Sequence, residues 1–332
     1  MPVTLSQVAA RAGVSVKTAS RALNQEAYVS ATTRARVLAA ADELGYRRNR
    51  LAHELRTGGG SALVGLISGD LANPFYSAVA SGVERELRRH GLLLVTANND
   101  EDRERERDLI EALLERRVRA LLVVPSSGYR APSGAPDGDA RTAGTPAGQE
   151  YPTDIPVVFL DRPPEGLAAD CVLIDNAGGA RSAAEHLLAA GHHRIALVAD
   201  LVRTASQRAR IEGFAAAMRA AGNTEWEPYL RTDVHDAVTA ERTVRELMAL
   251  PSPPTAVFAT NNRLTTGALR ARPPALVGFD DFELADVVGV TVVAHDMTAL
   301  GREAARLALT RIDGYTGPPR TVVIPTSLIV RT

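Results

Sequence analysis

The sequence predicts a small all-α head followed by an α/β body of two lobes, each built on a doubly wound parallel sheet. The head is indicated by three short segments within residues 4–44 that combine helical apolar periodicity with capping residues. The body is indicated by short β-branched runs that alternate with amphipathic segments from Ala62 onwards. These runs are continuously apolar, as expected for strands covered on both faces. Between head and body, residues 57–61 are rich in Gly and Ser, which is typical of a flexible joint.

The first two helices of the head are expected to meet at a tight bend. Thr4 and Gln7 have the spacing of a capping box, which predicts a helix over residues 5–12. Gly13 can adopt the left-handed conformation that ends this helix, and Ser15 can cap the next one.

The second helix presents a face that suits contact with DNA. Ala19 points back towards the first helix, and a third helix over about residues 31–44 completes the small core. The side chains left outward are Val16, Lys17, Ser20 and Arg21. Cationic donors can read guanine edges, a hydroxyl can bind phosphate and a methyl group can contact thymine, so we predict that this helix lies in the major groove. The alternative is an ordinary helical hairpin with a solvated face.

The distribution of charge supports a nucleic-acid partner for the head. The net charge of the chain is −1, but residues 1–60 hold nine Lys or Arg against four acidic residues, a balance of +5. The remaining 272 residues therefore carry −6, so a basic head is attached to an acidic body. The single Cys171 excludes an intrachain disulfide, and we find neither a signal peptide nor an apolar run of about twenty residues. We therefore expect a cytoplasmic protein with no membrane contact.

The body is expected to contain two consecutive series of strands and helices. The first series has strands at 62–67, 92–98, 120–126 and 155–161, and the second at 171–175, 194–200, 255–260 and 275–280. Helices are expected at 74–90, 101–116, 177–190, 207–221, 238–250 and 264–270. Two further strand-like runs, at 290–296 and 321–331, flank a helix over 297–314. Residues 126–154 are rich in Gly, Pro, Ser, Ala and Asp without apolar periodicity, so we interpret them as a surface insertion.

With these residues in place, the chain resembles the lactose-repressor (LacI/GalR) family of bacterial transcription regulators over nearly its whole length. In the head and hinge the resemblance is carried by TLSQVAARAGVSVKTASRALN at 4–24, Val29-Ser30, Arg34, Gly45-Tyr46 and Asn49-Arg50-Leu51-Ala52. In the body it is carried by Asn73-Pro74-Phe75-Tyr76, Asp161-Arg162-Pro163, Gly191-His192, Arg210-Ile211-Glu212-Gly213-Phe214, Thr260-Asn261-Asn262 and Gly278-Phe279-Asp280-Asp281.

The resemblance implies a division of the chain and a mode of assembly. A helix-turn-helix DNA-binding domain would occupy residues 1–46, and a hinge helix with its linker residues 47–61. The body would be of the periplasmic-binding-protein type, with an N-terminal lobe of 62–161 and 291–320 and a C-terminal lobe of 162–290 and 321–332. Because one head covers only a half-site, the resemblance also implies a homodimer on a roughly palindromic operator.

The resemblance assigns roles in DNA binding to individual residues. Lys17 and Arg21 would read bases, Val16 would make an apolar contact, and Thr18 and Ser20 would lie nearer phosphates. Leu55 occupies the place of the hinge leucine that wedges into the minor groove and kinks the operator. The other residues assigned to the DNA surface are Thr4, Asn24, Arg34, Asn49 and Arg56.

The resemblance also places an effector cleft between the lobes. Its lining would include Phe75, Tyr76, Ser126, Asp161, Ser206, Arg210, Asn261 and Asp280. Carboxylate, amide and Arg groups at strand ends suit the hydroxyls of a sugar-like effector, which the resemblance implies releases the repressor from DNA. Metals and cofactors are not expected.

Three features depart from the family pattern. Many sugar-binding members place a stacking aromatic near Asp233, where this chain has Val234-His235. The segment between Thr260 and Gly278 is shorter than usual, and the insertion at 126–154 replaces a helix.

Other functions were weighed against this one. An enzyme would need a nucleophile with its base or a metal cluster, and the adjacent His192-His193 would point to opposite sides of the chain. No phosphate-binding glycine loop follows the first strand. A periplasmic solute receptor would share the fold of the body, but it would carry a signal peptide in place of the basic head. An activator or a corepressor-dependent regulator stays open as an alternative to an inducible repressor.

Overall fold

The computed structural model describes residues 3–24, 26–46, 61–126, 151–164, 167–223 and 226–331. The chain divides into two compact units, residues 1–60 and 61–332. The hinge predictions Asn49, Leu55 and Arg56 lie outside the described residues, as does nearly all of the insertion at 126–154. None of the helices in the described ranges combines the length and apolar character needed to cross a membrane.

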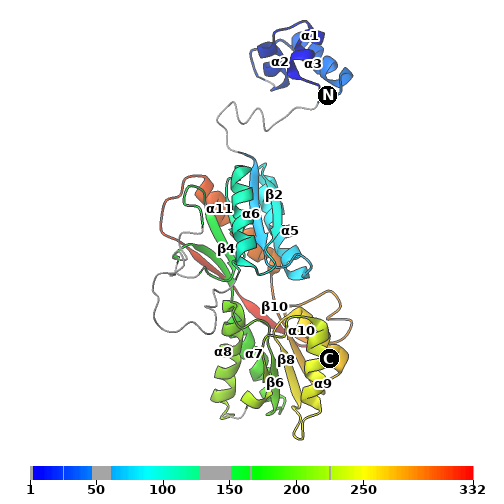
Figure 1. Ribbon diagram of the computed structural model, residues 1–332, viewed down its shortest axis with the longest axis vertical. Helices are drawn as coiled ribbons and strands as arrows, with labels where there is room; N and C mark the ends of the chain where they lie inside the picture. Colours follow the sequence, from blue (N-terminus) through cyan, green and yellow to red (C-terminus); the bar gives the residue numbers. More distant parts are fainter. Residues whose placement is uncertain are drawn as a thin grey trace. The chain divides into compact units, whose positions relative to one another are not determined.

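The head consists of the three expected helices, α1 (Leu5–Ala12), α2 (Val16–Leu23) and α3 (Ala31–Glu43) (Figure 1). The capping box is present, because Thr4 N donates to Gln7 Oε1 at 2.8 Å and Gln7 N donates to Thr4 Oγ1 at 3.4 Å. Gly13 ends α1 with a φ of 63°, in the left-handed region that favours glycine. The bend between α1 and α2 is therefore confirmed.

The core of the head is made mostly of small side chains, which allow three short helices to pack closely. Its buried members are Val8, Ala9, Ala12, Ala19, Ala22, Val29, Val37, Ala40 and Ala41. Leu23 of α2 is half-buried and packs against this cluster.

The first lobe of the body is a six-stranded parallel sheet between two helical layers (Figure 1). Its strands are β1 (Leu63–Ser68), β2 (Leu93–Asn98), β3 (Leu121–Val123), β4 (Val157–Asp161), β5 (Asp170–Ile174) and β11 (Thr321–Ile324), in the order β11-β5-β4-β3-β1-β2. Helices α5 (Pro74–Arg89) and α11 (Met297–Ile312) pack together on one face, and α6 (Arg103–Glu115) covers the other. Successive strand residues serve the two faces: Leu121 packs with the α6 cluster, and Leu122 with the α5 and α11 cluster.

The second lobe repeats this arrangement with one antiparallel edge strand. Its strands are β6 (Ile195–Val198), β7 (Leu230–Arg231), β8 (Ala256–Ala259), β9 (Leu276–Phe279), β10 (Thr291–His295) and β12 (Thr326–Ile329), in the order β12-β10-β9-β8-β6-β7. Only β12, which pairs with β10, runs antiparallel. Helices α7 (Asn176–Ala189) and α8 (Ala205–Ala220) cover one face, and α9 (Ala237–Met248) and α10 (Asn262–Ala271) the other. The predicted fold class of an all-α head and two doubly wound lobes is confirmed.

Glycines allow the paired helices to approach closely. A Cβ on Gly82 of α5 would collide with the carbonyl oxygen of Thr298 in α11. Similarly, a Cβ on Gly213 of α8 would collide with the carbonyl oxygen of Ala177 in α7. The second contact matters for function, because it fixes α8 against the start of α7 near the junction of the lobes.

The predicted lobe boundaries were wrong at two strands. The predicted strand at 171–175 was placed in the C-terminal lobe, but β5 lies in the first sheet between β4 and β11. The predicted strand at 290–296 was placed almost entirely in the N-terminal lobe, which was expected to resume at residue 291, but β10 lies in the second sheet beside β9. Both runs are apolar on both faces, so either sheet could accept them and periodicity alone could not choose.

The final segment, 321–331, was expected to belong to the C-terminal lobe but is shared between the lobes. β11 pairs with β5 in the first sheet, and β12 pairs with β10 in the second. Pro325 separates the two strands, because proline has no N–H to continue a hydrogen-bonded ladder. The chain therefore crosses between the lobes after Ile174, after His295 and after Ile324.

Candidate functional site

A cavity of about 180 Å³ lies between the two lobes of the body. Residues that follow the carboxyl ends of strands in both sheets line it, which is where doubly wound folds bind ligands. Seven of the eight residues predicted for the effector cleft are among them: Phe75, Tyr76, Asp161, Ser206, Arg210, Asn261 and Asp280. Charged residues that sequence reasoning did not select also line it, among them Asp70, Glu101, Arg162, Asp200, His235 and Arg263.

Arg210 of α8 is the best-anchored side chain on the second-lobe wall. It is 4% exposed, and its Nε donates to Asn176 Oδ1 at 2.8 Å while Nη1 donates to the carbonyl oxygen of Thr260. Its guanidinium lies over the Phe279 ring, with Cζ 3.7 Å from the centroid. Nη2 is 3.8 Å from Asp280 Oδ1. These partners hold the positive charge of Arg210 beside the carboxylate of Asp280.

Two buried aspartates, one from each lobe, occupy equivalent positions at strand ends. Asp161 ends β4 and Asp280 directly follows β9, and both have a positive φ, 66° and 69°. Such a backbone conformation costs an L-residue free energy and clusters at functional sites. Burial raises the pKa of Asp161, although Arg162 and Arg210 oppose that effect. The buried Oδ1 of Asp280 accepts no hydrogen bond among the described residues.

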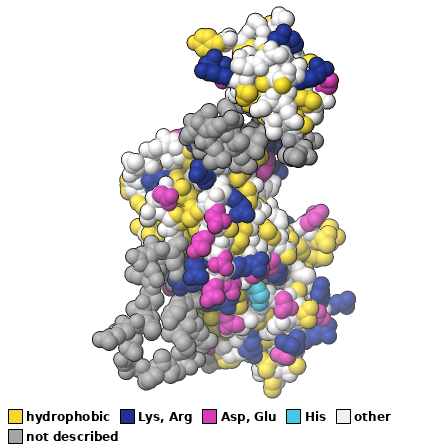
Figure 2. All heavy atoms as spheres, turned by 45° about the horizontal axis from the view of Figure 1, so that its top comes forward, with side chains coloured by type: hydrophobic (Ala, Val, Ile, Leu, Met, Phe, Trp, Pro, Cys, Tyr) yellow, Lys and Arg dark blue, Asp and Glu magenta, His cyan; other side chains and the backbone are white. Residues whose placement is uncertain are grey.

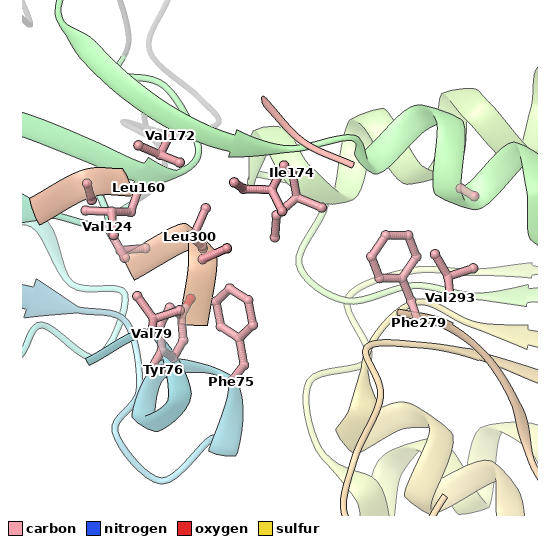
Figure 3. Packing of buried hydrophobic residues seen from close by; sticks show 14 of the residues in the cluster. Phe75, Tyr76, Val79, Val124, Leu160, Val172, Ile174, Phe279, Val293 and Leu300 are labelled. Atoms are coloured by element: carbon pink, nitrogen blue, oxygen red, sulfur yellow. The ribbon is translucent and has the colours of Figure 1, made fainter. Parts of the chain in front are cut away.

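An ion pair between Arg162 and Glu101 forms the first-lobe wall. Arg162 Nη1 and Nη2 donate to the two carboxylate oxygens of Glu101 at 2.9 and 2.6 Å. Nη2 also donates to the hydroxyl of Tyr76 at 3.4 Å, and burial raises the pKa of that hydroxyl so that it stays protonated. The Phe75 ring lies edge-on to Tyr76, with centroids 4.8 Å apart. Figure 3 shows Phe75 on the side of this cluster that faces Phe279 in the second lobe.

His235 is held at the cavity by a chain of hydrogen bonds. Its Nδ1 lies 2.8 Å from Asp200 Oδ1, and Asn261 Nδ2 donates to Asp200 Oδ2 at 2.7 Å. The hydrogen bond to Asp200 raises the pKa of His235, so protonation is favoured there. Val234 is buried in the core of the lobe, so only His235 of this pair faces the cavity.

Two contacts join the lobes at the cavity. Arg263 Nη2 of α10 lies 2.5 Å from Asp70 Oδ2, which follows β1. Asn262 Nδ2 donates to Asn73 Oδ1 at 2.9 Å. Movement of one lobe against the other would have to break or replace these contacts.

His295 lies at one of the crossings between the lobes. Its side chain is fully buried, and neither ring nitrogen has a hydrogen-bond partner among the described residues. The ring centroid is 5.8 Å from that of Phe75 and 6.1 Å from that of Phe279, one in each lobe. Burial lowers the pKa of His295, so the imidazole is neutral. Among the described residues, no group of three or more His, Cys, Asp and Glu side chains could hold a metal ion.

Ser126 is the one predicted cleft residue that does not line the cavity. Its N–H donates to Glu106 Oε2 at 2.6 Å, and Glu106 also accepts from Asn99 Nδ2 and the Tyr151 hydroxyl, at 2.8 and 2.7 Å. The buried carboxylate of Glu106 therefore holds Ser126 and Tyr151 at the two ends of the insertion.

In the head, the face predicted to read bases is exposed. Val16 is 46% exposed and Lys17 is exposed, whereas Ser20 and Arg21 are half-buried. Arg21 Nε lies 3.5 Å from Glu26 Oε2, so a base contact would have to replace this weak ion pair. Figure 2 shows basic side chains on the visible face of the head, and basic and acidic side chains intermixed on the body.

Four other predicted DNA-contacting residues also have structural partners. Thr4 caps α1, and Thr18 N donates to Ser15 Oγ at 3.1 Å. Asn24 ends α2, and Arg34 Nη2 donates to the carbonyl oxygen of Glu26 at 2.8 Å. The side chains of Thr4, Thr18 and Arg34 and the backbone N–H of Asn24 thus contribute to the fold of the head at positions that the resemblance assigns to the DNA surface.

Comparisons with known proteins agree with both units. Residues 4–49 match the family described as bacterial regulatory proteins, lacI family, and residues 184–332 match a periplasmic binding protein-like domain. The HTH-type transcriptional regulator GalS of Salmonella typhimurium is 31% identical, over 92% of this chain and 89% of GalS. The ribose operon repressor of Escherichia coli is 30% identical, over 93% of each chain. The crystal structure of the lac repressor dimer bound to operator and the anti-inducer ONPF matches with a TM-score of 0.81 at 26% identity, covering 100% of this chain and 98% of that one.

Proposed function

The chain belongs to the lacI family of bacterial regulatory proteins, and we propose that it is a dimeric repressor released from a palindromic operator by a sugar-like effector. The family membership makes it a DNA-binding transcription regulator and not an enzyme. Operator binding would place it in the cytoplasm. The names of the relatives support a sugar-like effector, since one is a ribose operon repressor and a solved regulator of 29% identity is a complex with cellobiose.

The observation that carries this proposal is the polar cavity between two lobes of a chain that also has a DNA-reading head. Its anchored groups suit neighbouring hydroxyls, because Asp280 can accept from a ligand hydroxyl and Asn261 and Ser206 offer further polar atoms. Phe75 and Tyr76 supply an apolar surface for the carbon face of a sugar ring. A ligand there touches both lobes at once.

Binding can affect DNA only if the ligand prefers one arrangement of the lobes. The cross-lobe contacts Asp70–Arg263 and Asn73–Asn262 mark the surfaces that such a rearrangement would change. The first lobe begins with β1 at Leu63, directly after the linker to the head, so its movement would reach the head through the chain. Coupling of about 1–3 kcal/mol would weaken operator binding roughly 5- to 150-fold at saturating effector.

For DNA reading we propose the roles implied by the resemblance. Lys17 and Arg21 contact bases, Val16 makes an apolar contact and Leu55 wedges into the minor groove. The others, Thr4, Thr18, Ser20, Asn24, Arg34, Asn49 and Arg56, position the head through phosphate and sugar contacts.

The proposal is tested by selecting operator sequences from fragmented genomic DNA with the full-length protein. A two-fold symmetric motif, bound by two chains in a stoichiometry measurement, is expected. Operator complexes are then titrated with D-ribose, D-galactose and cellobiose. Release supports an inducible repressor, whereas tighter binding would identify the corepressor-dependent alternative. Selection of no motif would refute the proposal.

A further inference from the structure

We infer that the effector of this cavity donates hydrogen bonds and carries no negative charge. Neutral or amine-bearing monosaccharides therefore bind, and their carboxylate or phosphate counterparts are excluded. The inference rests on the proposed function, because it concerns the ligand of the same cavity. It separates this chain from any family relative whose cavity takes an anion.

The first argument is the balance of charge. Six carboxylates line the cavity against three arginines: Asp70, Asp100, Glu101, Asp161, Asp200 and Asp280, and Arg162, Arg210 and Arg263. Arg105 lies 2.7 Å from Asp100, and the hydrogen bond to Asp200 favours protonation of His235. Even with both of these counted as cations, six acidic groups face five basic ones. Because burial raises the pKa of Asp161, its negative charge is disfavoured, and even without that charge the cavity has no net positive charge to attract an anion.

The second argument is that each arginine is already committed to protein partners. Arg162 directs both terminal nitrogens to Glu101. Arg263 lies 2.5 Å from Asp70. Arg210 donates to Asn176 and Thr260, and its Nη2 lies 3.8 Å from Asp280 Oδ1. Recognition of a carboxylate or phosphate by arginine uses two parallel N–H donors, so an anion would compete with these protein partners for the guanidinium groups.

The helix N-termini beside the cavity are each capped by a side chain of the protein. Three helices, α5, α8 and α10, begin beside the cavity, and free N–H groups there could attract an anion. Side chains cap all three: Asn73 accepts from Phe75 N at 3.1 Å, Thr204 from Gln207 N at 3.4 Å and Asn261 from Leu264 N at 2.9 Å.

The third argument is that open acceptors remain in the cavity. Asp280 Oδ1 is buried without a hydrogen-bond partner among the described residues, and Asp161 Oδ2 lies 3.6 Å from Arg162 Nε, which is too far for a good hydrogen bond. A buried acceptor left unpaired costs free energy, which a ligand hydroxyl or ammonium group would recover. Because the two carboxylates come from different lobes, a ligand with donors at both ends would satisfy both.

The size of the cavity directs the choice of probes. A cavity of about 180 Å³ is smaller than the range of about 300–1,000 Å³ typical of sites for drug-sized ligands, which favours a small ligand. This matches a monosaccharide with its hydroxyls better than a disaccharide.

The expected loss of affinity for an anionic ligand follows from Coulomb's law. A negative charge about 5 Å from one carboxylate, at an effective dielectric constant of about 20, is disfavoured by about 3 kcal/mol, which is roughly a 200-fold loss of affinity. We expect each anionic probe to bind at least about 100-fold more weakly than its neutral counterpart.

The test is calorimetric titration of the full-length protein with matched probes. These are D-glucose, D-glucosamine, D-glucuronate and D-glucose 6-phosphate, the same four forms of D-galactose, and D-ribose beside D-ribose 5-phosphate. Binding of a neutral or amine-bearing probe, with its anionic counterpart excluded, is expected. An anionic probe that binds as tightly as its neutral counterpart would overturn the inference, as would the absence of binding by every neutral and amine-bearing probe at millimolar concentration.

Isosteric variants connect the selectivity with the carboxylates. Asp161→Asn and Asp280→Asn should each lower the affinity for the neutral probe at least about 10-fold. Each should also lower the ratio of the affinity for the neutral probe to that for its anionic counterpart by a similar factor. Asp108→Asn, which removes the same charge from an exposed position on α6, is the control and should change neither. An unchanged ratio in both cavity variants would refute the electrostatic argument.

The two proposals fail in different ways. A protein that shows this selectivity but selects no operator would refute the repressor proposal and leave the inference intact. A protein released from its operator by an anionic probe alone would refute only the inference.

Discussion

Replacing Arg210 by Met should destabilise the second lobe of the body strongly. Methionine keeps the apolar length that packs on Phe279 but removes the charge and all of the donors. Asn176 Oδ1 and the carbonyl oxygen of Thr260 then lose their donor, and the buried carboxylate of Asp280 loses the guanidinium 3.8 Å away.

The cost can be worked from these contacts. At 3.8 Å and an effective dielectric constant of about 20, the attraction between Arg210 and Asp280 is about 4 kcal/mol. Removing one partner of a buried pair typically costs about 3–5 kcal/mol, because the other charge stays buried. Asp280→Asn alone should cost less, at most about 2 kcal/mol, since Arg210 retains its other partners. The double variant should therefore be more stable than the sum of the single effects by about 1–3 kcal/mol.

Urea unfolding followed by tryptophan fluorescence measures the changes in the free energy of unfolding of the single and double variants. Trp226 is the only tryptophan in the chain, is buried, and packs against Phe214 of α8 with ring centroids 5.5 Å apart. It therefore reports on the lobe and the helix that hold Arg210. An Arg210→Met midpoint equal to that of the wild type, or additive effects in the double variant, would refute the description of Arg210 and Asp280 as a mutually dependent buried pair.

Three further predictions concern the head, the hinge and pH. Arg21→Ala should cost about 1–3 kcal/mol of operator affinity and relax preference at one base pair per half-site, whereas Arg11→Ala, which removes a cation paired with an acidic side chain of α3, should leave base preference unchanged in a binding-site selection. Leu55→Ala should reduce operator bending in a FRET assay without altering the melting temperature of the body, and an unchanged bend would exclude a wedge. For His295, burial lowers the pKa from its ordinary value of 6.5, so stability is complete above about pH 6.5 and declines as pH falls below it. His295→Gln should remove part of that decline between pH 7.5 and 5, and melting curves that lose stability equally in both proteins would contradict the assignment.

Local sequence patterns predicted the helices and strands of this fold more accurately than they predicted which strands pair in each sheet. The capping residues of α1 and the continuous apolar runs of the strands depend on neighbours in sequence, so periodicity could identify them. The assignment of β5 and β10 to sheets depends on pairing across the chain, which no local pattern encodes. Pro325 was the one local signal that could have divided the last segment between the lobes. The two-residue β7 is too short to produce any periodic pattern.

The same distinction applies to the cavity. Asp161 and Asp280 could be selected because each stands at the end of an apolar strand, where parallel sheets collect polar groups. Glu101 could not, because its link to Arg162 joins residues 61 positions apart and Glu101 belongs to a charged segment that resembles any solvated helix start. Ser126 follows a strand as the aspartates do, yet its N–H is drawn to Glu106 and away from the cavity.

The equivalence of Asp161 and Asp280 bears on how the cavity could act as a switch. Each terminates a parallel strand in its own lobe, with a left-handed backbone and a carboxylate whose hydrogen-bonding capacity the protein leaves partly unused. Either carboxylate alone could bind a donor with the lobes in any arrangement. Only one arrangement lets a single small ligand reach both, and that difference in affinity is what a ligand needs in order to shift a conformational equilibrium. The cross-lobe pair Asp70–Arg263 acts on the same equilibrium when no ligand is bound. Loss of that pair should therefore change the effector concentration needed for a response, whereas the two aspartates still determine which ligand binds.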